Sequence, residues 1–107
     1  MVLKNIMPLL LSFLFAISTA MAQKKVTISG TVKDHNTNEK LIGVNILLLP
    51  SKMYAVTNEY GFFSLTVPKG DYTLEVSYIS YETYMQEISA TQDTRLSIDL
   101  REDALQL

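Results

Sequence analysis

Acid–base or metal chemistry in this sequence would have to centre on His35, because the chain has one histidine and no cysteine. His35 lies in the polar stretch 34–40, "DHNTNEK", whose composition is typical of a turn. A metal site needs two or three ligands at the spacing of a strand or a helix, and Asp34 and Glu39 do not give His35 that spacing. We therefore expect no metal site and no Cys–His or Ser–His–Asp catalysis.

Carboxylate pairs are the remaining route to acid–base chemistry, and two of them must converge in a cleft to share the roles of acid and base. Four candidates lie near expected turns or on expected exposed faces, and nothing in the sequence brings them together: Glu59, Asp71, Glu82 and Glu87. A later group favours solubility, with weak calcium binding as the alternative: Asp93, Asp99, Glu102 and Asp103. The sequence thus predicts no catalytic residues, no cofactor and no enzyme activity.

Aromatic side chains are the other candidates for binding, because exposed rings on a sheet can stack on sugars or contact a partner. Phe63, Tyr72 and Tyr78 occupy apolar positions of their strands and are expected to face the core. Tyr81 follows a strand, where a tyrosine can fix a corner through its hydroxyl group. The rings that remain as candidates for carbohydrate or partner contact are Tyr60, Phe62 and Tyr84.

The segments that carry these residues have a two-residue period. In 26–32, apolar residues and Gly30 alternate with polar residues, which predicts a half-buried strand. Similar patterns mark six further short segments: 44–49, 54–57, 63–67, 72–78, 84–88 and 96–100. No segment after residue 23 has an apolar stripe at helical spacing. The sequence therefore predicts an all-β fold, a seven-stranded antiparallel β-sandwich, with a small barrel as the alternative.

Two glycine-containing patterns are expected to form hairpin loops between these strands. Residues 58–61 and 67–70 both end in glycine, which suits a turn followed by a left-handed residue. Gly61 and Gly70 are expected to supply the positive φ, and Pro68 to fix φ at the second position. Neither glycine belongs to a phosphate-binding pattern, so we assign all three residues a structural role in turns.

The segment 44–49 is apolar on both faces. Val44, Ile46 and Leu48 alternate with Leu47 and Leu49, so neither side of the strand is polar. Strands of this kind are typically buried on both sides. We therefore expect this strand to be covered on both faces.

The N-terminus has the layout of a secretory signal peptide. An apolar run at 6–17 leads through small residues to an A-x-A cleavage pattern that ends at Ala22. The run is shorter than the ~20 apolar residues that span a bilayer, with an uncleaved anchor or a buried helix as the alternative. We expect a helical signal peptide at 1–22, cleavage between Ala22 and Gln23, and an exported domain at 23–107.

The charge of the exported domain excludes one class of partner. Cleavage would leave 85 residues (107 − 22), with 8 basic side chains (9 − 1) and 11 acidic ones, for a net charge of −3. The charges are scattered singly and form no basic stripe, so we expect no nucleic-acid binding. Because there is no cysteine, the domain must also fold without disulfides.

Four stretches together resemble the carboxypeptidase-regulatory-like domain family. They are "SGTVKD" (29–34), "LIGVNI" (41–46), "TNEYGFFSLTVPKGDYTLEVSYISYET" (57–83) and a closing strand before "LREDALQL" (100–107). The resemblance covers the whole chain after the signal peptide and implies a seven-stranded sandwich of prealbumin-like topology. One departure is Ser80, where many members of the family have glycine at a corner.

With a signal peptide directly in front, the domain resembles the N-terminal extension of TonB-dependent outer-membrane receptors of Bacteroidetes-type bacteria. In such receptors a TonB box, a plug domain and a barrel follow. The printed chain ends at Leu107, where that box would begin, so we expect nutrient transport to belong to a longer protein.

The resemblance implies a non-catalytic periplasmic interaction module at the outer membrane of a Gram-negative bacterium. Its partner would be a periplasmic protein or the rest of the receptor. The alternatives are a free-standing secreted carbohydrate-binding module and a regulatory domain for a separate enzyme. If a partner strand pairs with the domain, exposed edge strands such as 54–57 are the candidates.

Overall fold

The computed structural model describes residues 24–104. The expected signal peptide, the cleavage site between Ala22 and Gln23, and residues 105–107 lie outside the described residues. Within 24–104, no helix is long and apolar enough to span a bilayer.

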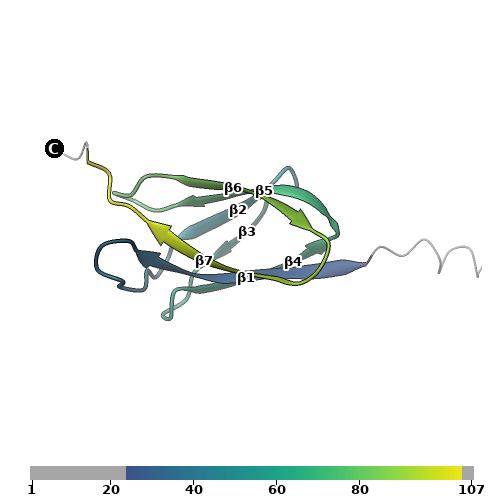
Figure 1. The fold of residues 1–107 in the computed structure, drawn as a ribbon, viewed down its shortest axis with the longest axis horizontal. Helices are drawn as coiled ribbons and strands as arrows, with labels where there is room; N and C mark the ends of the chain where they lie inside the picture. The colour runs from purple at the N-terminus through teal and green to yellow at the C-terminus, as the bar shows by residue number, and fades with distance from the viewer. Residues whose placement is uncertain (1–23, 105–107) are drawn as a thin grey trace, which may run out of the picture.

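The described residues form seven strands in two layers (Figure 1). The strands are β1 (Lys25–Asp34), β2 (Asn45–Leu49), β3 (Met53–Val56), β4 (Phe62–Pro68), β5 (Gly70–Ser77), β6 (Tyr84–Ala90) and β7 (Thr94–Leu100). One sheet has the order β4-β1-β7 and the other β3-β2-β5-β6. The prediction of an all-β, seven-stranded sandwich is therefore confirmed.

One strand pairing differs from the antiparallel arrangement that the sequence predicted. β1 and β7 run parallel, with Ile28 opposite Thr94 and Asp34 opposite Leu100, whereas the other four pairings are antiparallel. Each strand reverses the direction of the one before it, so the first and the seventh strand run the same way. Because they are neighbours in one sheet, their pairing has to be parallel.

The core lies between the two sheets and follows the predicted alternation. The fully buried large side chains include Phe63, Ile28, Ile46, Leu48, Leu74, Ile98 and Leu100. Gly30 is the one inward-facing position at the centre of β1 without a side chain, because there is no room for one. A Cβ there would fall against the carbonyl oxygen of Leu96 and 3.1 Å from the Phe63 ring.

The prediction of two hairpin loops is wrong. The glycine-containing segments 58–61 and 67–70 connect strands of different sheets. β3 and β4 belong to different sheets, and so do β4 and β5. Gly61 has a φ of 70°, the left-handed conformation that the turn pattern predicts. Gly70 is not left-handed; it is the first residue of β5, because only Lys69 separates β5 from Pro68 at the end of β4.

The outward face of β2 is not covered by any element within residues 24–104, contrary to the prediction. Leu47 and Leu49 point away from the core and are half-buried. Leu47 lies between Tyr54 of β3 and Glu75 of β5. The apolar pattern of this strand therefore indicates a surface that the sandwich itself does not cover.

A tyrosine corner ties the end of the chain to the first loop. The Tyr81 hydroxyl donates a 2.7 Å hydrogen bond to the buried Asp34 carboxylate. The backbone after β7 is held at this corner, since Glu82 N–H donates to Arg101 and Asp103 N–H donates to Ser80. Ser80 has a φ of 73°, the conformation that favours glycine and that explains the glycine in the resembling sequences.

Candidate interaction surface at strand β3

The three candidate aromatic rings do not come together on one sheet. Tyr60 is 63% exposed in the loop after β3. Phe62 is half-buried at the start of β4, in the three-stranded sheet. Tyr84 begins β6 in the other sheet, packs against the core and donates through its hydroxyl to Gln86. It is therefore less exposed than expected, and carbohydrate contact by these rings stays a prediction.

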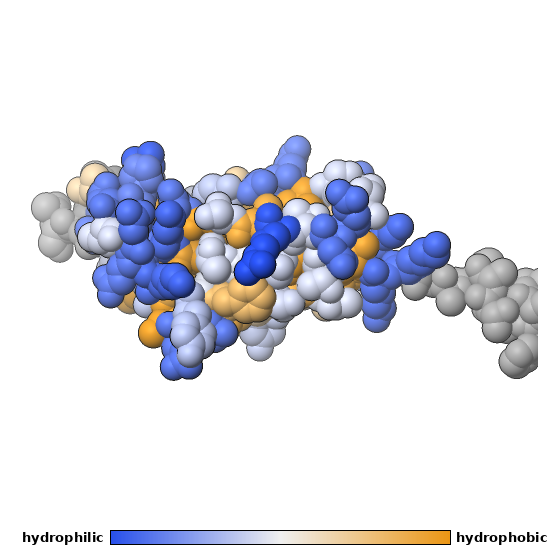
Figure 2. Space-filling view, turned by 60° about the horizontal axis from the view of Figure 1, so that its bottom comes forward, coloured by the Kyte–Doolittle hydropathy of each residue, from blue (hydrophilic) through white to orange (hydrophobic). Residues whose placement is uncertain are grey.

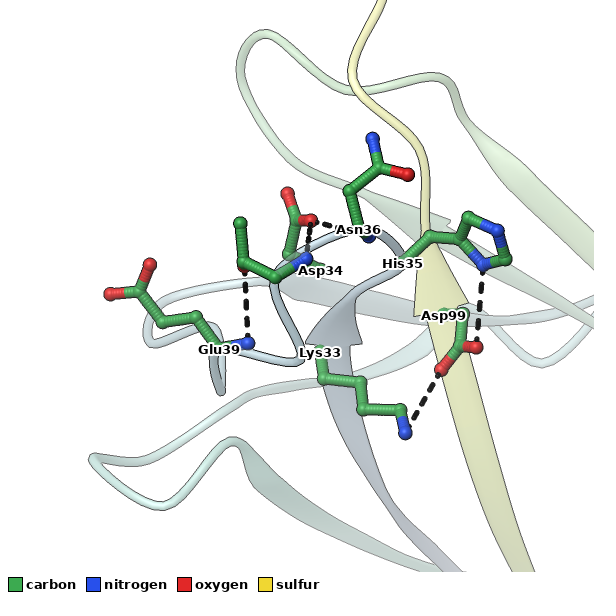
Figure 3. Close-up of polar contacts among 7 residues, drawn as sticks. Lys33, Asp34, His35, Asn36, Glu39 and Asp99 are labelled. Atoms are coloured by element: carbon green, nitrogen blue, oxygen red, sulfur yellow. Dashed lines mark hydrogen bonds and ion pairs between the residues drawn. The ribbon is translucent and has the colours of Figure 1, made fainter.

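The end of β1 uses its ionisable groups within the domain (Figure 3). His35 Nδ1 lies 3.6 Å from Asp99 Oδ2, and Lys33 Nζ lies 3.8 Å from Asp99 Oδ1. The Asp34 carboxylate instead accepts bonds from the N–H groups of Asn36 and Thr37 in the following turn. Among residues 24–104 no three His, Cys, Asp or Glu side chains are grouped as metal ligands.

Hydrogen bonding shifts the pKa of both partners at the tyrosine corner. The Tyr81 hydroxyl, followed by the Thr37 N–H, holds the pKa of the Asp34 carboxyl below its usual value. The same bond to Asp34, with a smaller contribution from burial, raises the pKa of Tyr81 to about 12. Asp34 is thus an ionised acceptor that organises a turn, a structural role and not that of a general acid.

Strand β3 concentrates exposed apolar side chains at one edge of the four-stranded sheet. Met53, Tyr54 and Val56 are 38%, 72% and 49% exposed, and Ala55 is half-buried toward the core. Ile42 and Tyr60 are also exposed. They lie in the loop before β2 and the loop after β3, which meet near Val56 through the bond from Gly43 N–H to Thr57 C=O. Of the seven exposed large apolar side chains within the described range 24–104, five therefore lie on or beside this strand. We call these five residues the β3 surface.

The backbone of β3 has hydrogen-bonding groups available on its outer side. Thr57 N–H donates to Val44 across the pairing with β2, and Ala55 lies opposite Ile46 in the same ladder. In an antiparallel ladder every second residue bonds to the neighbouring strand, so Thr57 and Ala55 face β2. Tyr54 and Val56 consequently direct their N–H and C=O groups away from the sheet.

Thr57 fixes the loops at the end of the β3 surface. Its side chain is 3% exposed; its Oγ1 accepts from Val44 N–H at 2.9 Å and donates to Leu41 C=O at 2.7 Å. Its own carbonyl accepts from Gly43 N–H at 3.0 Å. Sequence reasoning missed this role. The available signal was a hydroxyl residue at an inward-facing position of the strand pattern.

The surface turned forward in Figure 2 has a different character. Many hydrophilic side chains gather toward the two ends of the domain there, and between them one strongly hydrophilic side chain lies among paler and apolar areas. The outward positions of the three-stranded sheet are rich in hydroxyl residues: Thr27, Ser29, Thr31, Ser64, Thr66 and Ser97. Short polar side chains of this kind are typical of a solvated sheet face.

Residues 24–104 form a small two-layered β-sandwich with an open apolar edge at β3. Asp71 and Glu87 line one surface depression, and His35, Glu82 and Asp99 line another. Residues 28–107 match the model of the CarboxypepD_reg-like domain, and the chain belongs to this family.

Two curated relatives are TonB-dependent receptors. The chain is 27% identical to TonB-dependent receptor P3 of Formosa agariphila over 97% of its own length, and 30% identical to TonB-dependent receptor SusC of Bacteroides thetaiotaomicron over 89%. The chain spans only 10% and 9% of the lengths of these two relatives.

Solved structures share the fold at lower sequence identity. A cohesin–X-dockerin complex from Acetivibrio cellulolyticus matches with a TM-score of 0.64 and 24% identity, over 70% of this chain and 56% of that one. A DUF3823 family protein from Parabacteroides merdae matches with a TM-score of 0.62 and 15% identity, over 76% and 48%. These likenesses support the sandwich fold alone.

Proposed function

We propose that this chain is a non-catalytic protein-interaction module, the N-terminal periplasmic domain of a TonB-dependent outer-membrane nutrient receptor. Residues 1–22 would be the export signal and 23–107 the domain. The observation that carries the proposal is the family membership of 28–107, combined with curated relatives that are TonB-dependent receptors.

The arrangement of the ionisable groups supports a non-catalytic role. Asp34 has three hydrogen-bond donors on its carboxylate, and Asp99 has Lys33 and His35 beside it. A general acid or base needs to reach a substrate proton within hydrogen-bond distance, from a cleft. Both carboxylates are engaged by groups of the domain itself, at the first loop and the ends of β1 and β7, although Asp99 also lines a surface depression with His35.

The proposed location and partners rest on the relatives. A domain of an outer-membrane receptor in a Gram-negative bacterium would be exported, and its partner would be a periplasmic protein or the rest of the receptor. The β3 surface supports this role, because exposed apolar side chains grouped at one edge are typical of protein–protein contact sites.

An immunoblot of fractionated cells of the source organism, with antibodies against residues 24–104, tests the proposal. We expect the signal in the outer-membrane fraction, on a polypeptide roughly ten times the length of this chain, as the coverage of the relatives implies. Added protease should remove the signal only after the outer membrane is made permeable. A small polypeptide in the culture medium would contradict the proposal and favour a secreted module.

A further inference from the structure

We infer that β3 is the docking edge for one extended strand of a partner polypeptide, which pairs antiparallel with Met53–Val56. The partner strand is apolar at alternate positions, basic toward its N-terminal end and acidic toward its C-terminal end. This inference rests on the proposed function as an interaction module, and it adds the surface and the chemistry of the partner.

The first observation is that β3 lacks the side chains that protect an edge strand from pairing; its one protective feature is that it is short, with four residues. Proteins usually protect edges with charged side chains, proline or bulges. Of the other edges, β6 carries Glu87, β7 carries Arg95 and Asp99, and β4 ends in Pro68. The four residues of β3 are all apolar or aromatic and include no charge and no proline.

The second observation is that side chains and backbone are presented together. The backbone groups of Tyr54 and Val56 face outward, and their exposed side chains lie on the outer face of the sheet, beside Leu47 and Asn45. An added strand would place its own residues directly opposite these two side chains. Aromatic and β-branched pairs across neighbouring strands stabilise a sheet, which favours apolar partner residues at these positions.

For an antiparallel partner strand, the charges at the two ends of β3 set the charges expected at the partner's ends. Lys52 precedes the strand and Glu59 follows it, both exposed, and neither takes part in the two ion pairs found within residues 24–104. In an antiparallel pairing the partner begins beside the Val56 end, so a basic residue at its start lies near Glu59. An acidic residue at its end lies near Lys52.

A second copy of this chain would present the same end charges, Lys52 and Glu59, so the length of the pairing decides between it and a separate extended strand. Four residues of β3 span only about 13 Å, and two such strands bury far less than the ~1,200 Å² of a stable interface. A copy could not lengthen the pairing, because Pro50 precedes its β3 and the loop 57–61 follows it. An independent strand can continue past Val56 toward Ile42 and Tyr60.

Two variants remove the docking edge while keeping the sandwich. Val56→Pro deletes an outward N–H and leaves the ladder bonds of Ala55 to β2 in place, a position where an edge strand tolerates proline. Tyr54→Lys adds the protective charge that β3 lacks. Met85→Lys is the matched control, since Met85 is 55% exposed on the outer face of the same sheet, but on β6. Thermal melts of all three variants establish that they remain folded.

The probe is a synthetic heptapeptide with blocked ends, Lys-Val-Thr-Val-Thr-Val-Glu, titrated into the 107-residue chain. Binding is followed by fluorescence anisotropy of the labelled peptide and by amide chemical shifts of the protein. We expect shifts at residues 52–57 and the adjoining loops, unchanged binding to Met85→Lys, and binding weakened about tenfold or more by Val56→Pro and Tyr54→Lys. The charge-reversed peptide, with Glu first and Lys last, should bind more weakly.

The inference is overturned if the peptide does not bind, if Val56→Pro binds it as well as the unmodified chain, or if the shifts fall on β6 or β7. Equal binding of the charge-reversed peptide overturns the assigned direction and end charges. A concentration-dependent dimer that Val56→Pro abolishes would assign the edge to a second copy and also overturn the inference. Because the titration uses purified chain and synthetic peptide, its result is independent of the immunoblot that tests the receptor assignment.

Discussion

Replacing Thr57 by valine should destabilise the domain strongly, although the two side chains have nearly the same shape. A valine side chain could neither accept from Val44 N–H nor donate to Leu41 C=O, the two bonds that the threonine hydroxyl now makes. Both partners belong to buried residues, with relative exposures of 0% and 7%. The substitution therefore leaves two buried backbone groups without a partner.

The expected cost follows from the cost of each unpaired group. A buried donor or acceptor that loses its partner costs about 1–3 kcal/mol. Two such groups cost about 2–6 kcal/mol, and subtracting about 0.8 kcal/mol for the added buried methyl group leaves a loss of about 1–5 kcal/mol in the free energy of unfolding. For a domain of this size, each kcal/mol lowers Tm by about 4–8 °C, so the melting temperature should fall by roughly 5–40 °C.

Thermal and urea unfolding followed by circular dichroism measure this loss, and hydrogen exchange locates it. The amides of Gly43 and Val44 should lose protection in Thr57→Val more than amides at the centre of β1. Thr57→Ser is the matched control, because it keeps the hydroxyl and loses one methyl group, at a cost of about 1 kcal/mol. Thr66→Val removes one exposed hydroxyl contact, with Thr27, and should change stability by less than about 1 kcal/mol.

Two results would refute this account of Thr57. Thr57→Val could prove as stable as the unmodified chain within about 0.5 kcal/mol, which would mean that the hydroxyl bonds contribute nothing net. Alternatively, Thr57→Ser could be as destabilised as Thr57→Val, which would make the methyl group the important part of the side chain.

Three further substitutions test the fold at single positions. Ser80→Gly should raise the free energy of unfolding by about 0.5–1 kcal/mol, because Ser80 has a φ of 73°; an unchanged or lower urea midpoint would contradict this. Gly30→Ala should lower the free energy of unfolding by about 1–3 kcal/mol or more, because the new Cβ meets the Leu96 carbonyl. An unchanged melting temperature would show that β7 can shift to make room at no cost. Tyr81→Phe should change the pH profile of stability at both ends. The pKa of Asp34 is lowered on folding, so stability present above pH ~4 is lost as pH falls, and less should be lost without the Tyr81 hydroxyl. Folding raises the pKa of Tyr81 from 10.0 to about 12, so the stability that this bond contributes below pH 10 is lost as the pH rises from 10 to 12. Tyr81→Phe should not show this alkaline loss. Identical pH profiles for the variant and the unmodified chain would contradict both the acid and the alkaline prediction.

The strands could be predicted from the sequence because their side chains alternate. The segment 26–32 corresponds to β1, and 72–78 corresponds to β5 within a few residues, since burial on one face imposes a two-residue period. The pairing of the strands could not be predicted, because alternation does not say which strand lies beside which. The parallel β1–β7 pair and the connections between the sheets depend on that long-range arrangement.

The candidate surface was only partly visible in the sequence. The segment 54–57 was a candidate edge, and β3 does lie at the edge of its sheet. Tyr84 was expected to be exposed, but its inward position on β6 places the ring against the core. The apolar outward face of β2 was expected to be covered; its exposure became visible only when the two layers were known. The position of a side chain at an edge therefore had to come from the structure.

Site-specific photo-crosslinking in living cells of the source organism tests the central claim, that this domain binds a partner through β3, most directly. A photoreactive phenylalanine derivative replaces Tyr54 in one strain and Met85 in a matched strain, and the crosslinked peptides are mapped by mass spectrometry. We predict crosslinks from position 54 to one extended segment of a periplasmic or receptor polypeptide, and none to that segment from position 85. Equal crosslinking from both positions, or none from position 54, would contradict the account.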